Sequence, residues 1–138
     1  MSRDTVQPWL GVDVDSDEFD RWLDQLRQEL SVEEWREIGV SGSPAFKNSF
    51  ANDTLGPTTA FYKDPFQIVR LRGVINTGTS GTVAFTLSEG YRPPATLYFP
   101  ALQTGGTAGA YVEIQSDGDV IPVYTGAEIH LNNISFRI

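Results

Sequence analysis

The sequence predicts a mainly β protein, an antiparallel, jelly-roll-like β-sandwich preceded by a short N-terminal helical arm. Up to about Gly39 the chain is acidic, and its apolar residues recur at helical spacing. Beyond this residue, short alternating apolar runs are interrupted by Gly, Pro, Asn and Asp, which is typical of many short strands. We therefore expect an acidic attachment arm over residues 1–31 and a β-sandwich domain over residues 32–138.

Residues 1–15 contain one pair of large apolar neighbours, Trp9 and Leu10, within a stretch rich in Asp. Such a pair is unfavourable in water and needs a covering surface. Two interpretations remain open: the pair is an anchor that inserts into a partner, or it folds back onto the chain's own domain.

A helix is predicted to begin at Ser16, a good N-cap, with Asp17 and Glu18 suited to the positive end of the helix dipole. Its apolar residues follow the 4-3-4 spacing of a heptad seam and lie on the face that also carries Trp22. The seam residues are Phe19, Leu23, Leu26 and Leu30. Two heptads are too few for an independent coiled coil. The face therefore either helps to hold subunits together or packs on the chain's own domain.

A second short helix is predicted after the first. Ser31 and Glu34 fit a capping box, and the helix would carry Val32, Trp35 and Ile38 before ending at Gly39.

The β domain is predicted from runs of period-two alternation. The expected strands cover residues 67–75, 82–87, 95–102, 110–115, 120–124, 129–131 and 134–138. Pro122 predicts an edge strand or a bulge, because proline cannot donate a ladder hydrogen bond. Turns are expected at residues 76–81, 89–94 and 116–119, and a loop at residues 103–109. Asn132 and Asn133 shift the register between two apolar faces, so a bulge or a tight turn is expected there.

Composition and charge exclude several classes of function. The net charge is −8, with eleven acidic against four basic residues through residue 38 and seven against six afterwards. This balance disfavours nucleic acid binding, which needs a basic face. For the arm, we favour a solvated acidic helix face over docking to a basic partner. No run is apolar enough to insert into a membrane, and no signal peptide core follows Met1, so we expect synthesis in a cytoplasm.

No catalytic, cofactor or metal site is predicted. Cysteine is absent, and the one histidine, His130, has no triad partners nearby, so we interpret it as a strand residue. The run Asp13, Asp15, Asp17 lacks the glycine of a calcium loop, and helix N-terminal acids explain it better. Asp117 and Asp119 could in principle be glycosidase carboxylates, but they have ordinary roles in a turn.

Aromatic residues gather in one segment of the β domain, and we expect them to fill the core and a subunit interface rather than to form a sugar-stacking platform. They are Phe46, Phe50, Phe61, Tyr62 and Phe66.

Five pieces of the sequence resemble a small β-sandwich found in bacteriophage virion proteins, typically tail-fibre, minor-tail and head-fibre (decoration) proteins. They are WREIG at 35–39, GSPAFKN at 42–48, VRLRGVI at 69–75 with Gly78, FTLSEGYRP at 85–93 and LNNISF at 131–136. The resemblance implies a homotrimeric, non-enzymatic protein on the exterior of the virion, made in the host cytoplasm. It carries over no catalytic or receptor-binding residue. The arm here is short where many relatives have a long fibre, which favours a compact appendage or a capsid decoration protein.

We therefore expect a trimeric surface appendage of tail-fibre or tip type, attached to other virion proteins by its arm. Its distal loops would bind a glycan or protein of the host surface; the candidate residues are Gln103, Thr104, Thr107, Asp117 and Asp119. The alternative is a capsid decoration or head-fibre protein anchored on the shell by the same arm. A polysaccharide-cleaving tail spike is the third hypothesis.

Overall fold

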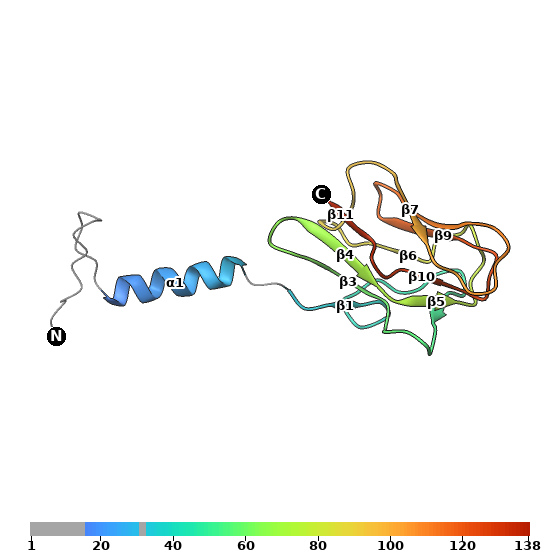
Figure 1. Cartoon of the computed structure of the whole chain (residues 1–138). Helices are drawn as coiled ribbons and strands as arrows, with labels where there is room; N and C mark the ends of the chain where they lie inside the picture. Colours follow the sequence, from blue (N-terminus) through green and yellow to red (C-terminus); the bar gives the residue numbers. More distant parts are fainter. Residues whose placement is uncertain (1–15, 31–32) are drawn as a thin grey trace. The chain divides into compact units, whose positions relative to one another are not determined.

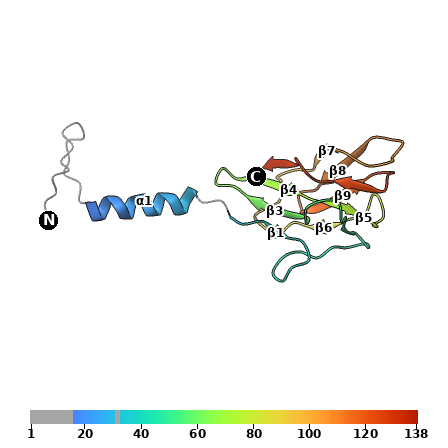
Figure 2. The same cartoon turned by 60° about the horizontal axis from the view of Figure 1, so that its bottom comes forward.

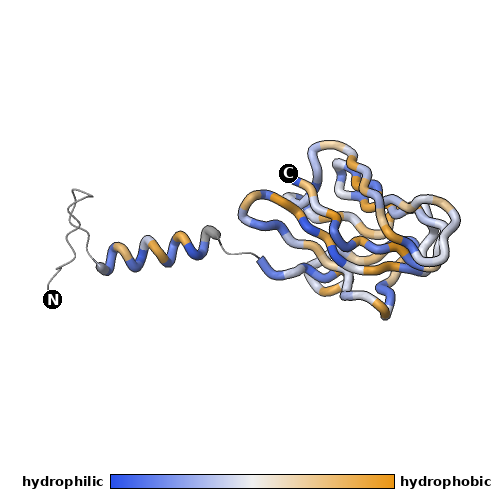
Figure 3. The backbone as a smooth tube through the Cα atoms, viewed as in Figure 1, coloured by the Kyte–Doolittle hydropathy of each residue, from blue (hydrophilic) through white to orange (hydrophobic). Residues whose placement is uncertain are grey.

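Two compact units make up the chain, Met1–Val32 and Glu33–Ile138. The computed structural model describes residues 16–30 and 33–138. In the first unit, helix α1 spans Ser16–Leu30, with Asp17 and Glu18 in its first turn and Arg27 in its last. These charges suit the helix dipole, and the predicted helix is confirmed. Apolar and polar residues alternate along α1 as an amphipathic helix requires (Figure 3).

The second unit is built from strands in three antiparallel sheets, and the prediction of a mainly β, antiparallel fold is confirmed. The strands are β1 Arg36–Glu37, β2 Ala51–Asn52, β3 Ala60–Lys63, β4 Ile68–Arg72, β5 Val74–Asn76, β6 Phe85–Thr86, β7 Leu97–Ala101, β8 Ala110–Ile114, β9 Asp119–Val123, β10 Glu128–His130 and β11 Ser135–Arg137. The sheet orders are β1-β3-β4-β11, β10-β5-β2 and β6-β9-β8-β7. Figures 1 and 2 show these sheets from two directions.

One core lies between the sheets, because most strands contribute buried apolar residues to it. Side chains with no exposed surface include Phe61, Val69, Ile75, Phe85, Leu87, Val112, Ile114, Val120, Ile129 and Leu131. Within the predicted aromatic segment, Phe50 and Phe61 are buried and Phe46 packs against the core. Phe66, by contrast, is exposed on the turn between β3 and β4.

The segment predicted as one strand over residues 67–75 is two strands in two different sheets. Gly73 separates β4 from β5 and has a φ of 128°, which side chains rarely adopt. A Cβ atom at Gly73 would also lie 2.6 Å from the Cα of Thr59. The alternation continues through the break, so the sequence pattern does not reveal it.

Pro122 does not lie on an edge strand or a bulge, because β9 runs between β6 and β8, and that prediction is wrong. The physical reason is the short length of β6, which pairs only with Val120 and Asp119. Beyond the end of β6, the carbonyl of Pro122 accepts a hydrogen bond from the Gly81 N–H at 2.8 Å. The nitrogen of Pro122 faces this same side, where no partner needs a donor.

The predicted second helix is also wrong. Residues 33–35 are irregular, and Arg36–Glu37 form strand β1, paired with β3. The carboxylate of Glu33 accepts hydrogen bonds from Lys63 and Tyr91, distant parts of the β domain, so tertiary contacts override the local helix signal.

Two predicted turns are confirmed. At residues 115–118, the Gly118 N–H donates to the Gln115 carbonyl at 2.9 Å, and Gly118 has a φ of 94°. At residues 132–133, Asn133 has a φ of 72°, and the Ile134 N–H donates to the Leu131 carbonyl at 3.4 Å. The chain keeps its direction through this tight turn, because β10 and β11 pair antiparallel with the consecutive strands β5 and β4.

Candidate functional site

The loops at one end of the β domain form the first candidate surface, which we call the far-end loops. They are residues 47–50, 77–82, 103–109 and 124–127, at the end of the domain away from Glu33 (Figure 1). The Thr77 hydroxyl donates to the Ser49 carbonyl at 2.7 Å, which joins two of the loops. Lys47 is the one residue with a formal charge in these segments, so the surface is neutral and rich in hydroxyls.

Gln103 gives the longest of these loops its shape. Its Oε1 accepts hydrogen bonds from the Thr125 and Gly126 N–H groups at 2.8 and 2.9 Å, and its Nε2 donates to the Ala108 carbonyl. Because both ends of the amide are used within the protein, Gln103 positions the loop. Thr104 and Thr107 are the exposed candidates beside it.

Asp117 and Asp119, the other predicted loop residues, lie at the opposite end of β8 from residues 103–109. Asp119 accepts a hydrogen bond from the Thr86 hydroxyl at 2.7 Å, and Asp117 accepts one from the Asp119 N–H at 3.1 Å. The structure therefore does not bring the two groups of candidates together. Receptor contact by either group stays a prediction.

A second candidate surface is a tyrosine pair on the outer face of β7 and β8. Tyr98 and Tyr111 are 63% and 39% exposed, and their ring centroids are 6.0 Å apart. A hydrogen bond to Glu113 and the charge of that carboxylate raise the pKa of Tyr98. Gln115 donates to Glu113 at 2.7 Å. Exposed aromatic rings beside a carboxylate suit stacking with sugars.

A third candidate is the outer face of the sheet β1-β3-β4-β11, which we call the arginine face and define by Trp35, Tyr62, Arg70, Arg72 and Arg137. Arg70 lies opposite Tyr62 on β3 and Ser135 on β11. The Trp35 and Tyr62 rings meet edge to face at 4.4 Å, and the Arg72 guanidinium lies 4.6 Å from the Trp35 ring centroid.

A cavity of about 270 Å³ opens on the arginine face. Its lining consists of Trp35, Arg70, Leu71, Asn133, Ile134 and Ser135. Sequence reasoning missed this site, although Arg70 and Arg72 alternate with the apolar Val69 and Leu71 in the sequence. The pairing of β4 with β11, which adds Ser135 and Arg137, is a long-range contact that the local pattern does not contain.

Asp64 stands at the border of this face, in the turn between β3 and β4, and accepts a hydrogen bond from Arg70 at 3.4 Å. Loss of hydration acts to raise its pKa. Hydrogen bonds from the Ile68 and Phe66 N–H groups, together with the Arg70 charge, outweigh that effect and hold the pKa of Asp64 below its ordinary value.

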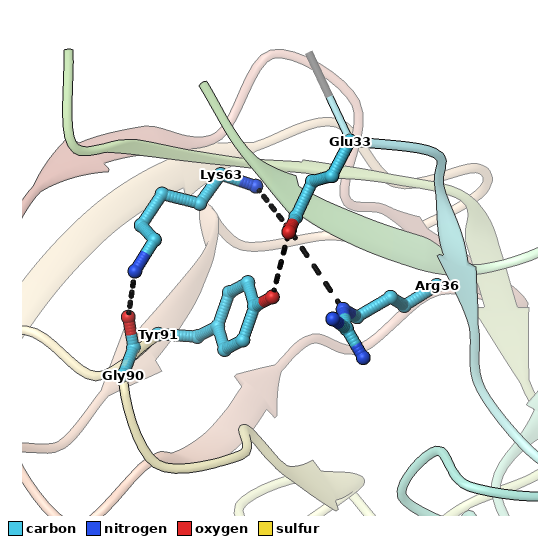
Figure 4. Close-up of polar contacts among 5 residues, drawn as sticks. All are labelled: Glu33, Arg36, Lys63, Gly90 and Tyr91. Atoms are coloured by element: carbon cyan, nitrogen blue, oxygen red, sulfur yellow. Dashed lines mark hydrogen bonds and ion pairs between the residues drawn. The ribbon is translucent and has the colours of Figure 1, made fainter. Parts of the chain in front are cut away.

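Glu33 fixes the point at which the chain enters the β domain (Figure 4). One carboxylate oxygen accepts from the Lys63 N–H and the other from the Tyr91 hydroxyl, both at 2.9 Å. Arg36 and Lys63 place their charges 5.2 and 5.1 Å from the centroid of the Tyr91 ring. Burial, and after it the bond to Glu33, raise the pKa of Tyr91. These contacts make the entry point a defined part of the domain.

The candidate seam lies on α1. Phe19 and Trp22 are 47% and 56% exposed, with ring centroids 6.0 Å apart, and Leu23 and Leu26 are half-buried. The side chain of Leu30, like all of Trp9 and Leu10, lies outside the described residues. A subunit seam on α1 and an anchor at Trp9 and Leu10 stay predictions.

In residues 16–30 and 33–138, no group of three His, Cys, Asp or Glu side chains could hold a metal ion. His130 lies in β10, where its N–H donates to the Leu102 carbonyl at 2.9 Å. Nor does the described part of the chain contain a helix that is long and apolar enough to cross a bilayer.

Comparison with known proteins gives one similar fold. No protein-family model matches the chain, and no curated protein matches it. The structure is similar to the crystal structure of the receptor binding protein (gp15) of Listeria phage PSA, with 17% sequence identity and a TM-score of 0.68. The match covers 94% of this chain and 82% of that chain, so it includes part of the N-terminal unit. The resemblance to phage virion proteins is therefore confirmed at the level of the fold.

Proposed function

We propose that this protein is a non-enzymatic structural protein of a bacteriophage virion, and that its β domain binds the surface of the host bacterium. The observation that carries the proposal is the fold similarity to a phage receptor binding protein over 94% of this chain. Similar folds serve different functions, so the proposal also depends on the surfaces of this chain.

The N-terminal unit is proposed to attach the protein to other virion proteins. Most of the negative charge belongs to the first 38 residues, whereas the rest of the chain is nearly neutral. Glu33 fixes the entry of the chain at one end of the β domain, and the far-end loops lie at the other end (Figure 1). A β domain that is held at its entry leaves these loops free to meet a host surface.

Three copies are proposed to assemble, with α1 contributing the heptad seam. An amphipathic helix with exposed Phe19 and Trp22 favours association with other helices. A trimer would also strengthen attachment, because several weak sites that act together raise retention on a surface. Light scattering at micromolar concentration should give three times the mass of the chain. A monomer would contradict this assembly.

Host binding is tested with the labelled full-length protein on a panel of intact bacteria. We expect retention on a restricted set of strains, and an unrelated β protein of similar net charge serves as the control. Retention on no strain, or equal retention on all strains, would count against the proposal.

A capsid decoration protein is the alternative with the same layout, and labelling of particles with antibody separates the two. Label on the tail supports the host-binding function, and label on the head supports decoration. Release of sugar ends from host envelopes would instead support the polysaccharide-cleaving hypothesis.

A further inference from the structure

The arginine face is unusual in a chain whose net charge is −8. Arg70 and Arg72 project from β4, and Arg137 projects from the neighbouring strand β11. The register places Arg70 opposite Ser135 and Arg137 opposite Ile68, so the three guanidinium groups share one side of the sheet. This side is opposite to the core, because Val69, Leu71 and Phe136 point inward between them.

The ion pairs of these guanidinium groups are weak and leave N–H donors for another partner. Arg70 is 3.4 Å from Asp64 and Arg72 is 3.7 Å from Glu37, and all four side chains keep some exposure. Exposed pairs of this length contribute little, typically about 0–1 kcal/mol. Within the described residues, Arg137 makes no side-chain hydrogen bond or ion pair. Arg70 and Arg137 can therefore pair with an incoming anion at small cost, whereas Arg72 also donates to the Thr58 carbonyl at 3.0 Å.

The cavity adds shape and chemistry to this charge. Trp35 forms an aromatic wall, Arg70 supplies a planar donor, and Ser135 and Asn133 supply a hydroxyl and an amide. Its volume of about 270 Å³ is slightly below the roughly 300–1,000 Å³ of ligand pockets for small molecules. It suits one unit of a polymer whose neighbouring units extend over Arg72 or toward Arg137.

We infer that the arginine face binds an anionic glycan, with one sugar or polyol unit against Trp35 and its phosphate or carboxylate group on Arg70. Arginine recognises both kinds of anion through paired N–H donors, and an aromatic ring can pack on the apolar side of the unit. The inference rests on the proposed function, because it names the ligand class that the β domain would take from a host surface.

Binding of the full-length protein to soluble polymers tests this inference. Calorimetry would use glycerol-phosphate oligomers, oligogalacturonate, uncharged dextran and polyglutamate. We expect binding to at least one of the two anionic glycans and none to dextran, with affinity that falls as salt is raised. The glycan that binds more tightly identifies the anion as a phosphate or a carboxylate.

Paired substitutions locate the site. The double variant Arg70→Gln, Arg137→Gln should bind about tenfold more weakly or worse, since two charge-assisted contacts are lost. The double variant Arg21→Gln, Arg27→Gln is the matched control, because it removes two positive charges from exposed positions of α1, outside the β domain, and should leave affinity unchanged. Unchanged thermal unfolding would show that both variants fold.

Several outcomes would overturn the inference: binding to neither anionic glycan, equal binding to dextran, preferred binding to polyglutamate, or an equal loss in the control variant of α1. The cell assay separates the two proposals. If the wild type and the Arg70, Arg137 double variant are both retained on cells, host binding is supported and the role of the arginine face is contradicted. If the wild type is not retained on cells but binds an anionic glycan that this double variant does not bind, the arginine face is supported and host binding is contradicted.

Discussion

Helix α1 differs from the β domain because several aromatic residues of the β domain are buried in its core, whereas both aromatic residues of α1 are exposed. Phe61 and Phe85 have no exposed surface in the β domain, whereas Phe19 and Trp22 on α1 remain about half exposed. A helix of 15 residues is marginal alone, since most helical stability in proteins comes from packing of the apolar face. The β domain therefore has a core that stabilises its own fold, whereas the exposed apolar face of α1 is where we propose an association. Four changes test this contrast.

The largest expected effect comes from the core of the β domain. Phe61→Ala removes a fully buried ring that packs 5.0 Å from the ring of Tyr91. It should lower the free energy of unfolding by about 3–5 kcal/mol. Urea denaturation followed by circular dichroism measures the change, with Phe19→Ala as the control. That control should alter the unfolding of the β domain by less than about 0.5 kcal/mol. Equal losses of unfolding free energy in both variants would contradict this difference between α1 and the β domain.

The next effect concerns the proposed association of α1. Leu23→Asp places a charge on the heptad seam and removes a leucine whose burial is worth about 1.5–3 kcal/mol per chain. The mass by light scattering should fall toward that of the monomer, with unchanged unfolding of the β domain. Arg21→Gln, on the exposed side of α1, changes the charge by the same amount and should keep the assembly. An assembly that survives Leu23→Asp would locate the seam elsewhere.

A smaller effect is expected at the entry to the β domain. Glu33→Gln keeps the shape of the side chain but removes the charge that accepts from Lys63 and Tyr91. Because Glu33 is partly exposed, we expect a loss of about 1 kcal/mol in the free energy of unfolding. The neighbouring Glu34→Gln is the control, since Glu34 is exposed. Indistinguishable variants would show that the entry point is held by other contacts.

The smallest effect is a pH dependence at the edge of the arginine face. The pKa of Asp64 lies below its ordinary value in the folded protein, so the unfolded chain binds more protons between the two values. The stabilisation is present above about pH 4 and is lost as the pH falls through the folded pKa. Urea midpoints at pH 5 and pH 3 should differ less in Asp64→Asn than in the wild type. Equal differences would contradict the assignment.

Local patterns predicted most strands, the first helix and the tight turns, because period, caps and turn residues act over a few positions. These patterns failed where contacts with residues distant in the sequence determine the local structure. The helix predicted from the capping box at Glu34 does not form, because Glu33 contacts β3 and Tyr91 instead. Pro122 fits inside a sheet because the neighbouring strand β6 is too short to need its missing N–H. The arginine face was missed for the same reason, since it exists only after β4 pairs with β11.

Gly73 has a consequence for how the β domain opens. It joins the last residue of β4 in one sheet to the first residue of β5 in another. Its N–H donates to the Asn132 side chain at 2.9 Å, and its carbonyl accepts from the Leu131 N–H at 2.8 Å. Fraying of either sheet must disturb this junction. Amide protons on β4 and β5 should therefore exchange with solvent at one common slow rate, as a single cooperative unit.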